Sequence, residues 1–72
     1  MHNKTESVYS QTLVAVFEAA LALGIDTQML ALQTKLEING YDEWLPLDLR
    51  HNASRIIDES VAVAKILFVN KS

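Results

Sequence analysis

The sequence predicts an all-α protein, and three observations support that class. Only one proline and two glycines occur in 72 residues, so few positions would interrupt a helix. Apolar residues recur at alternating steps of three and four, which is the period of one helix face. Gly24 and Asp26 stand close together, where they would end one helix and begin the next. We therefore expect one domain, 1–72, with two long helices and a short middle one at about 4–23, 27–38 and 46–69.

The first helix is expected to begin near residue 4, because Asn3 and Glu6 have the spacing of a capping box. Its apolar residues form two adjacent stripes. The stripe that we assign to the core of the chain is Tyr9, Leu13, Val16, Ala20 and Leu23. The second stripe is Val14, Phe17 and Leu21. So wide an apolar surface indicates that the helix is covered on two sides.

The second helix is expected to follow a tight glycine turn. Gly24 can adopt the left-handed conformation that ends a helix, and the Asp26 carboxylate can accept from the free N–H groups of the next one. The apolar stripe that we expect to face the core is Ile25, Met29, Leu32 and Leu36. Asn39 and Gly40, which tolerate positive φ, would end this helix.

The third helix is expected to begin at Pro46, whose fixed φ suits a first helical turn. It also carries two apolar stripes. We assign Leu49, Ala53, Ile56, Ser60, Val63 and Leu67 to the core. The second stripe is Ile57, Val61, Ala64 and Phe68. A single stripe is enough to pack a helix on its own domain, so the second one indicates a further helix from a partner.

The size and composition predict a homodimer. A chain of this length buries only about 60% of its unfolded surface, yet half of its residues are hydrophobic. Two copies would pair as a symmetric helical bundle through the spare stripes of the first and third helices. The predicted dimer interface is Val14, Phe17, Leu21, Ile57, Val61, Ala64 and Phe68.

Charge and composition argue against several classes of function. The net charge of −3 disfavours nucleic acid, whose binding depends on cation–phosphate contacts, and favours a partner with a basic surface. Cysteine is absent, and His2 and His51 are far apart, so we expect neither a metal nor a cofactor. The apolar runs fall short of a membrane span, and no secretory signal is present, so a cytoplasmic location is expected.

The sequence contains only one weak candidate for a catalytic site. His51 lies three residues after Asp48 and four before Arg55, where a carboxylate could orient its ring. No nucleophile or second acid is tied to it by spacing, and neither glycine lies in a phosphate-binding loop. We therefore expect a non-enzymatic regulatory or adaptor protein.

The segment between the second and third helices is the expected partner-binding site. Its two aromatic residues are of the types that dominate binding hot spots, and its two acids would steer a basic partner. The candidate residues are Tyr41, Asp42, Glu43 and Trp44, with Leu47 behind them. The alternative interpretation is that Trp44 folds inward as a lid over the core.

A DNA-binding regulator is the alternative function. The first turn resembles a helix–turn–helix unit, because Ala20, Gly24, Ile25 and Leu30 stand where that unit needs small, turn and apolar residues. Gln33 departs from the pattern at a normally buried position. In this interpretation the residues facing the duplex are Gln28, Lys35, Arg50 and Arg55. A structural oligomerisation module without a ligand site is a third possibility.

Overall fold

The computed structural model describes residues 4–41, 43 and 45–71, with side chains from residue 8 onward. The described chain forms three helices, α1 (Lys4–Ala22), α2 (Thr27–Asn39) and α3 (Leu47–Lys71). The predicted all-α class is confirmed, and every boundary lies within two residues of its predicted position. The predicted capping box at Asn3 and Glu6 lies outside the described residues and side chains.

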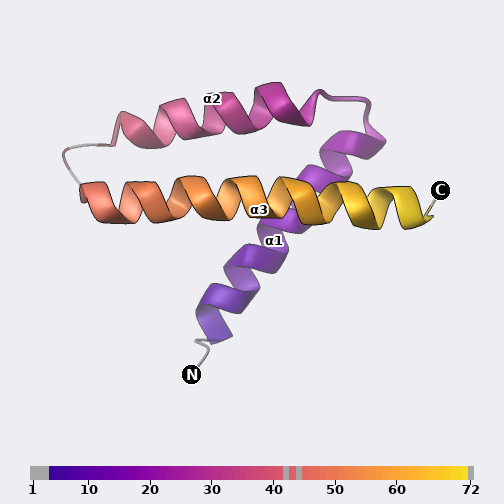
Figure 1. Ribbon diagram of the computed structural model, residues 1–72, viewed down its shortest axis with the longest axis horizontal. Helices are drawn as coiled ribbons and strands as arrows, with labels where there is room; N and C mark the ends of the chain where they lie inside the picture. Colours follow the sequence, from indigo (N-terminus) through magenta and orange to yellow (C-terminus); the bar gives the residue numbers. More distant parts are fainter. Residues whose placement is uncertain (1–3, 42, 44, 72) are drawn as a thin grey trace.

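The three helices form a flat arrangement around α3. Figure 1 shows α2 and α3 lying side by side, while α1 crosses α3 obliquely. Both α1 and α2 pack mainly against α3 and meet each other only slightly. The molecule measures 41 × 31 × 13 Å, so its shortest dimension is close to the diameter of a single helix. Each helix therefore keeps faces that no other helix covers.

The end of α1 is closed by hydrogen bonds around Gly24. Gly24 has a φ of 76°, and its N–H donates to the Leu21 carbonyl at 3.1 Å. The N–H of Ile25 donates to the Ala20 carbonyl at 2.9 Å. Together these two bonds are the pattern of a Schellman motif, which satisfies carbonyl groups that the helix end leaves free.

The two ends of α2 differ in how well the sequence predicts them. As expected, the Asp26 carboxylate accepts from the N–H groups of Gln28 and Met29, at 3.0 and 3.2 Å. At the other end α2 stops at Asn39 and Gly40 as predicted, although Gly40 has a φ of −79° and does not use the positive φ that it tolerates. The Gly40 N–H instead continues to donate to carbonyls of the last helical turn.

The beginning of α3 lies one residue later than expected. The Pro46 carbonyl accepts from the Arg50 N–H at 3.0 Å, so Pro46 occupies the capping position and Leu47 is the first helical residue.

The core lies where α1 and α2 meet α3. Its buried members are Phe17, Ala31, Ile57, Val61 and Ala64, with Val14, Leu21, Leu30 and Ile38 packed against them. Small residues are prominent: Ala20 and Ser60 are also buried, and the Ser60 hydroxyl donates to the Ile56 carbonyl at 2.7 Å. Small side chains allow helix axes to approach closely, so these positions lie where the helices cross.

The core consists of the stripes that the sequence analysis assigned to the dimer interface. Phe17, Ile57, Val61 and Ala64 are buried in the core of one chain, Val14 and Leu21 pack half-buried against it, and Phe68 is also half-buried. The four buried residues Phe17, Ile57, Val61 and Ala64 already pack against other helices of the same chain, so a second copy could reach them only if this core opened, whereas Val14, Leu21 and Phe68 keep accessible surface. Conversely Tyr9, Val16, Leu23, Leu49 and Val63, which were assigned to the core, are exposed.

On α2, too, the buried face and the exposed face are the opposite of those predicted. Thr27 and Ala31 are buried, and Leu30, Thr34 and Ile38 are half-buried, so this side of α2 faces the other helices. Ile25, Met29, Leu32 and Leu36 are exposed instead. The two sets lie about half a turn apart around the helix, because their residues follow the same steps of four and three with a two-residue offset.

The chain exposes more surface than its mass predicts. Its accessible surface is 5431 Å², whereas a folded monomer of 8.0 kDa typically exposes about 4450 Å². Its radius of gyration is 12.9 Å, compared with about 11 Å for a compact domain of 72 residues. The flat arrangement of the helices contributes to this excess of roughly 1000 Å².

Candidate functional site

The connector between α2 and α3 carries the residues that the sequence predicted to bind a partner. Tyr41 is half-buried, and its backbone is held at both sides: its N–H donates to Ile38 at 3.0 Å and its carbonyl accepts from Leu45 at 2.8 Å. Glu43 and Leu47 are exposed. Asp42 and Trp44, with the two interpretations of Trp44 as a lid or as a binding residue, lie outside the described residues.

An acid next to exposed apolar surface characterises this end of the molecule. Leu47 is 57% exposed, and Asp48 beside it is exposed in the first turn of α3. Glu43 stands four residues before Leu47. A carboxylate near an apolar anchor can attract a basic partner and then bury apolar area against it.

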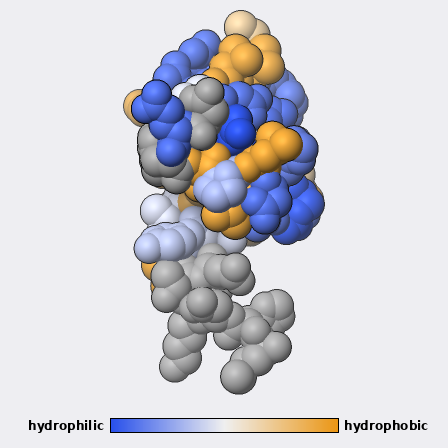
Figure 2. Space-filling view, turned by 90° about the vertical axis from the view of Figure 1, so that its left-hand side faces the viewer, coloured by the Kyte–Doolittle hydropathy of each residue, from blue (hydrophilic) through white to orange (hydrophobic). Residues whose placement is uncertain are grey.

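The outer face of α2 is a second candidate surface. Ile25, Met29, Leu32 and Leu36 are between 46% and 62% exposed and run along the side opposite the core. Figure 2 shows hydrophobic residues reaching the surface at the top of the molecule, where α2 lies, separated by hydrophilic residues from another hydrophobic group below. A continuous apolar stripe of this kind is typical of an interaction site.

One edge of α3 is a third apolar surface. Leu49, Val63 and Leu67 are exposed along it, and Ile56 is half-buried between them. A hollow of about 130 Å³ lies beside this edge, lined by Ser10, Val14, Ile56, Glu59, Ser60 and Val63.

An apolar hollow of about 210 Å³ lies between all three helices. Its lining residues are Tyr9, Ser10, Leu13, Thr34, Ile38, Ala53, Ile56 and Ile57. No charged residue lines it, so it suits an apolar side chain of a partner better than a polar substrate.

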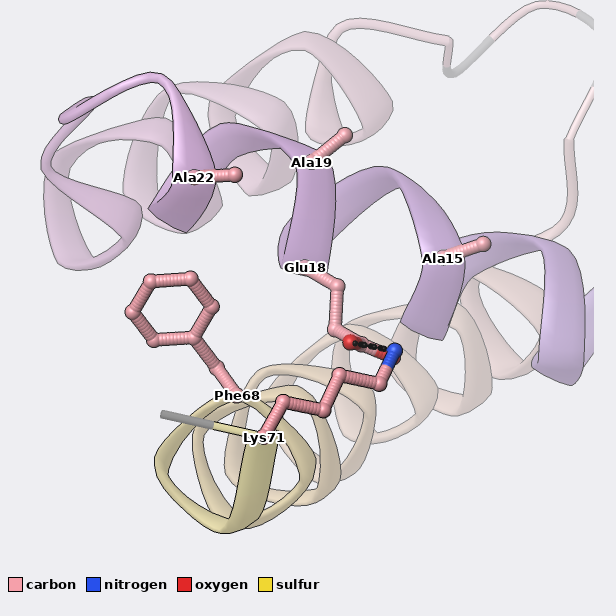
Figure 3. A pocket seen from close by; sticks show the side chains of 6 residues that line it. All are labelled: Ala15, Glu18, Ala19, Ala22, Phe68 and Lys71. Atoms are coloured by element: carbon pink, nitrogen blue, oxygen red, sulfur yellow. Dashed lines mark hydrogen bonds and ion pairs between the residues drawn. The ribbon is translucent and has the colours of Figure 1, made fainter.

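A shallower hollow of about 450 Å³ opens between α1 and the end of α3. Figure 3 shows the Phe68 ring of α3 below Ala22 of α1, with the Glu18–Lys71 ion pair at one side. Lys71 Nζ lies 2.7 Å from Glu18 Oε2, so the pair joins the two helices. This hollow therefore contains a surface ion pair beside small apolar residues, and not the acid and base that general acid–base catalysis requires.

Residues of the DNA-binding alternative already have partners within the chain. Lys35 Nζ lies 2.8 Å from Asp58 Oδ1, and Arg55 Nη1 lies 2.9 Å from Glu59 Oε1. Arg50 Nη1 donates to the Asn39 carbonyl at 3.2 Å, which helps to cap the end of α2.

The outward face of the would-be reading helix is also unsuited to a duplex. Gln28 is exposed on α2, but beside it lies the apolar stripe of this helix. Base readout requires polar side chains directed into the groove and cations on the flanking phosphates. The geometry therefore supports DNA binding less than protein binding.

None of the protein-family models, curated proteins or solved structures that were compared matches this chain.

Candidate catalytic and metal-binding groups do not assemble in the part of the chain that the structure describes. His51 is exposed on α3 and lines none of the hollows above. Over residues 4–41, 43 and 45–71, no three His, Asp or Glu side chains lie close enough together to bind a metal ion. Across the same ranges, no helix combines the length and apolar character that a membrane crossing requires.

The sequence predicted the apolar stripe of α2 but not its exposure, because the stripe was expected to face the core. A signal for the true inner face is present, because Thr27, Ala31, Thr34 and Ile38 follow steps of four, three and four. Their smaller side chains made this face less conspicuous than the large apolar stripe opposite. Close packing of α2 against α3 favours the smaller set.

Proposed function

We propose that this chain is a non-enzymatic adaptor or regulatory protein of the cytoplasm that acts by binding proteins, including a second copy of itself. The observation that carries the proposal is the apolar surface left uncovered on every helix of a flat molecule. An exposed stripe on α2, an exposed edge on α3 and the excess accessible area all support it.

The partner is proposed to be a protein with a basic surface that docks at the connector and the start of α3. Glu43 and Asp48 supply exposed negative charge there, and Leu47 supplies an apolar anchor. The charges would speed the encounter, whereas burial of Leu47 would slow dissociation.

The test is an affinity pull-down from an extract of the source organism, with and without nuclease, read by mass spectrometry. The test variant is Leu47→Lys, and the matched control is Ile66→Lys, because these side chains are 57% and 61% exposed on the same helix. They lie about 28 Å apart along α3, from a rise of about 1.5 Å per residue. Both variants add one positive charge, so charge alone does not separate them.

The proposal expects a discrete protein that survives nuclease, is lost with Leu47→Lys and is retained with Ile66→Lys. Recovery of the same protein with Leu47→Lys would reject the connector as its docking site. Recovery only of nucleic-acid-associated proteins, lost on nuclease treatment, would reject protein binding in favour of the DNA-binding alternative.

A further inference from the structure

We infer that the second copy docks on the outer face of α2, where Ile25, Met29, Leu32 and Leu36 of each chain pack against the same residues of the other. This inference rests on the self-association in the proposed function and names the surface that performs it. We call these four residues the α2 seam.

The spacing of the α2 seam is that of a two-helix contact. Its members follow steps of four, three and four, which is the repeat of apolar positions along the seam of paired helices. Met29, Leu32 and Leu36 lie on one side of α2, and Ile25, directly before the Asp26 cap, continues the same spacing. The seam therefore forms an apolar stripe along α2 that can pack against the same stripe of a second copy.

The position of the α2 seam leaves it without an intramolecular partner. Ala31 and Thr27, on the opposite side of α2, are buried against the rest of the chain. The four seam residues remain between 46% and 62% exposed. No rearrangement of the core is needed to bring two seams together, because nothing in the described chain has to move away from them.

The flanks of the seam are compatible with a two-fold contact between identical surfaces. Such a contact brings each patch against its own copy, so a strongly charged patch would repel itself. Gln28 and Gln33 beside the seam are uncharged, and Gln33 Nε2 donates to Glu37 Oε1 at 2.9 Å. Lys35 is paired with Asp58 within the chain. The residues that border the seam most closely are therefore uncharged amides, and the exposed carboxylates of Asp26 and Glu37 lie farther around the helix.

The chain as a whole exposes enough excess area for a dimer, and on α2 the exposed apolar part of that area lies along one stripe. The chain exposes roughly 1000 Å² more than a typical monomer of its mass, and each partner in a standard interface buries about 800 Å². The α2 seam would form the apolar centre of such an interface, with the neighbouring amide side chains as its rim.

The experiment measures the molar mass of the purified chain by sedimentation equilibrium over a wide concentration range. The test variant is Leu32→Lys, and the matched control is Leu49→Lys, because both leucines are 50% exposed on helices. Circular dichroism confirms that each variant keeps its helices, which exposed positions allow. Met29→Lys serves as a second seam variant, since Met29 is 62% exposed.

The inference expects a dimer of the 8.0 kDa chain whose dissociation constant rises at least about 100-fold with Leu32→Lys and with Met29→Lys. The change with Leu49→Lys should stay below about threefold, as for residues outside a binding hot spot.

Three outcomes would overturn the inference. A dimer weakened by Leu49→Lys but not by the seam variants would place the contact on the edge of α3. A dimer unaffected by all three variants would place it on neither surface. A wild-type monomer at every concentration would reject self-association altogether, while the pull-down above would still decide whether the chain binds another protein.

Discussion

Two valines on α3, two positions apart, test which apolar stripe forms the core. Val61 is 6% exposed and belongs to the core, whereas Val63 is 44% exposed on the edge of α3. The sequence alone favours the opposite assignment, so truncating each residue to alanine separates the two arrangements. Both changes remove the same two methyl groups from the same helix.

The expected losses follow from burial. At Val61, two methyl groups lose about 1.6 kcal/mol of transfer free energy, and an incompletely filled cavity adds about 1 kcal/mol. The better helix propensity of alanine returns about 0.5 kcal/mol at either position. Val61→Ala should therefore lower the free energy of unfolding by about 2 kcal/mol. At Val63 roughly half of the transfer term applies and no cavity forms, so the net loss should be about 0.4 kcal/mol.

The assay is urea unfolding followed by far-UV circular dichroism, with thermal unfolding as a second measure. The two losses in unfolding free energy correspond to a fall in Tm of about 8–16 °C for Val61→Ala and about 2–3 °C for Val63→Ala. Repeating the unfolding at several protein concentrations separates the contribution of self-association. Equal losses, or a larger loss for Val63→Ala, would refute the assignment of the core.

Four further substitutions test local features. Gly24→Ala should destabilise the chain by about 1–2 kcal/mol, because Gly24 has a φ of 76°. Gly40→Ala should cost less than Gly24→Ala in the same unfolding assay, since its φ is −79°, and an equal cost would contradict this. Asp26→Ala should cost about 1 kcal/mol through loss of the α2 cap, visible as a lower urea midpoint; no change would show that the cap contributes nothing. Asp58→Asn, which breaks the largely exposed pair with Lys35, should cost under about 1 kcal/mol in low salt and less in high salt; a salt-independent loss would argue against an ion-pair effect.

The candidate interaction surfaces were only partly predictable. Leu47 and Glu43 are exposed as a binding site requires, and their choice followed from residue type. The exposure of the α2 seam was not anticipated, because Met29, Leu32 and Leu36 are the kind of residues that usually point inward. A pattern of large apolar residues indicates that something covers them, but not whether the cover belongs to the same chain.

The sequence by itself determined the local structure. Asp26 caps α2 because a carboxylate placed just before a helix meets free N–H groups within a few residues. Gly24 turns the chain because it has no Cβ to oppose a positive φ. These causes act over one or two turns, so the helix boundaries could be predicted closely.

Only the tertiary structure decided which faces are buried. Both α1 and α3 carry two adjacent apolar stripes, and their periodicity alone does not distinguish the buried stripe from the exposed one. The choice depends on how closely helices approach, and Ala64 and Ala31 permit contacts that larger side chains would prevent. Since that fit involves residues far apart in the chain, the core and the uncovered α2 seam emerge only when the three helices are placed together.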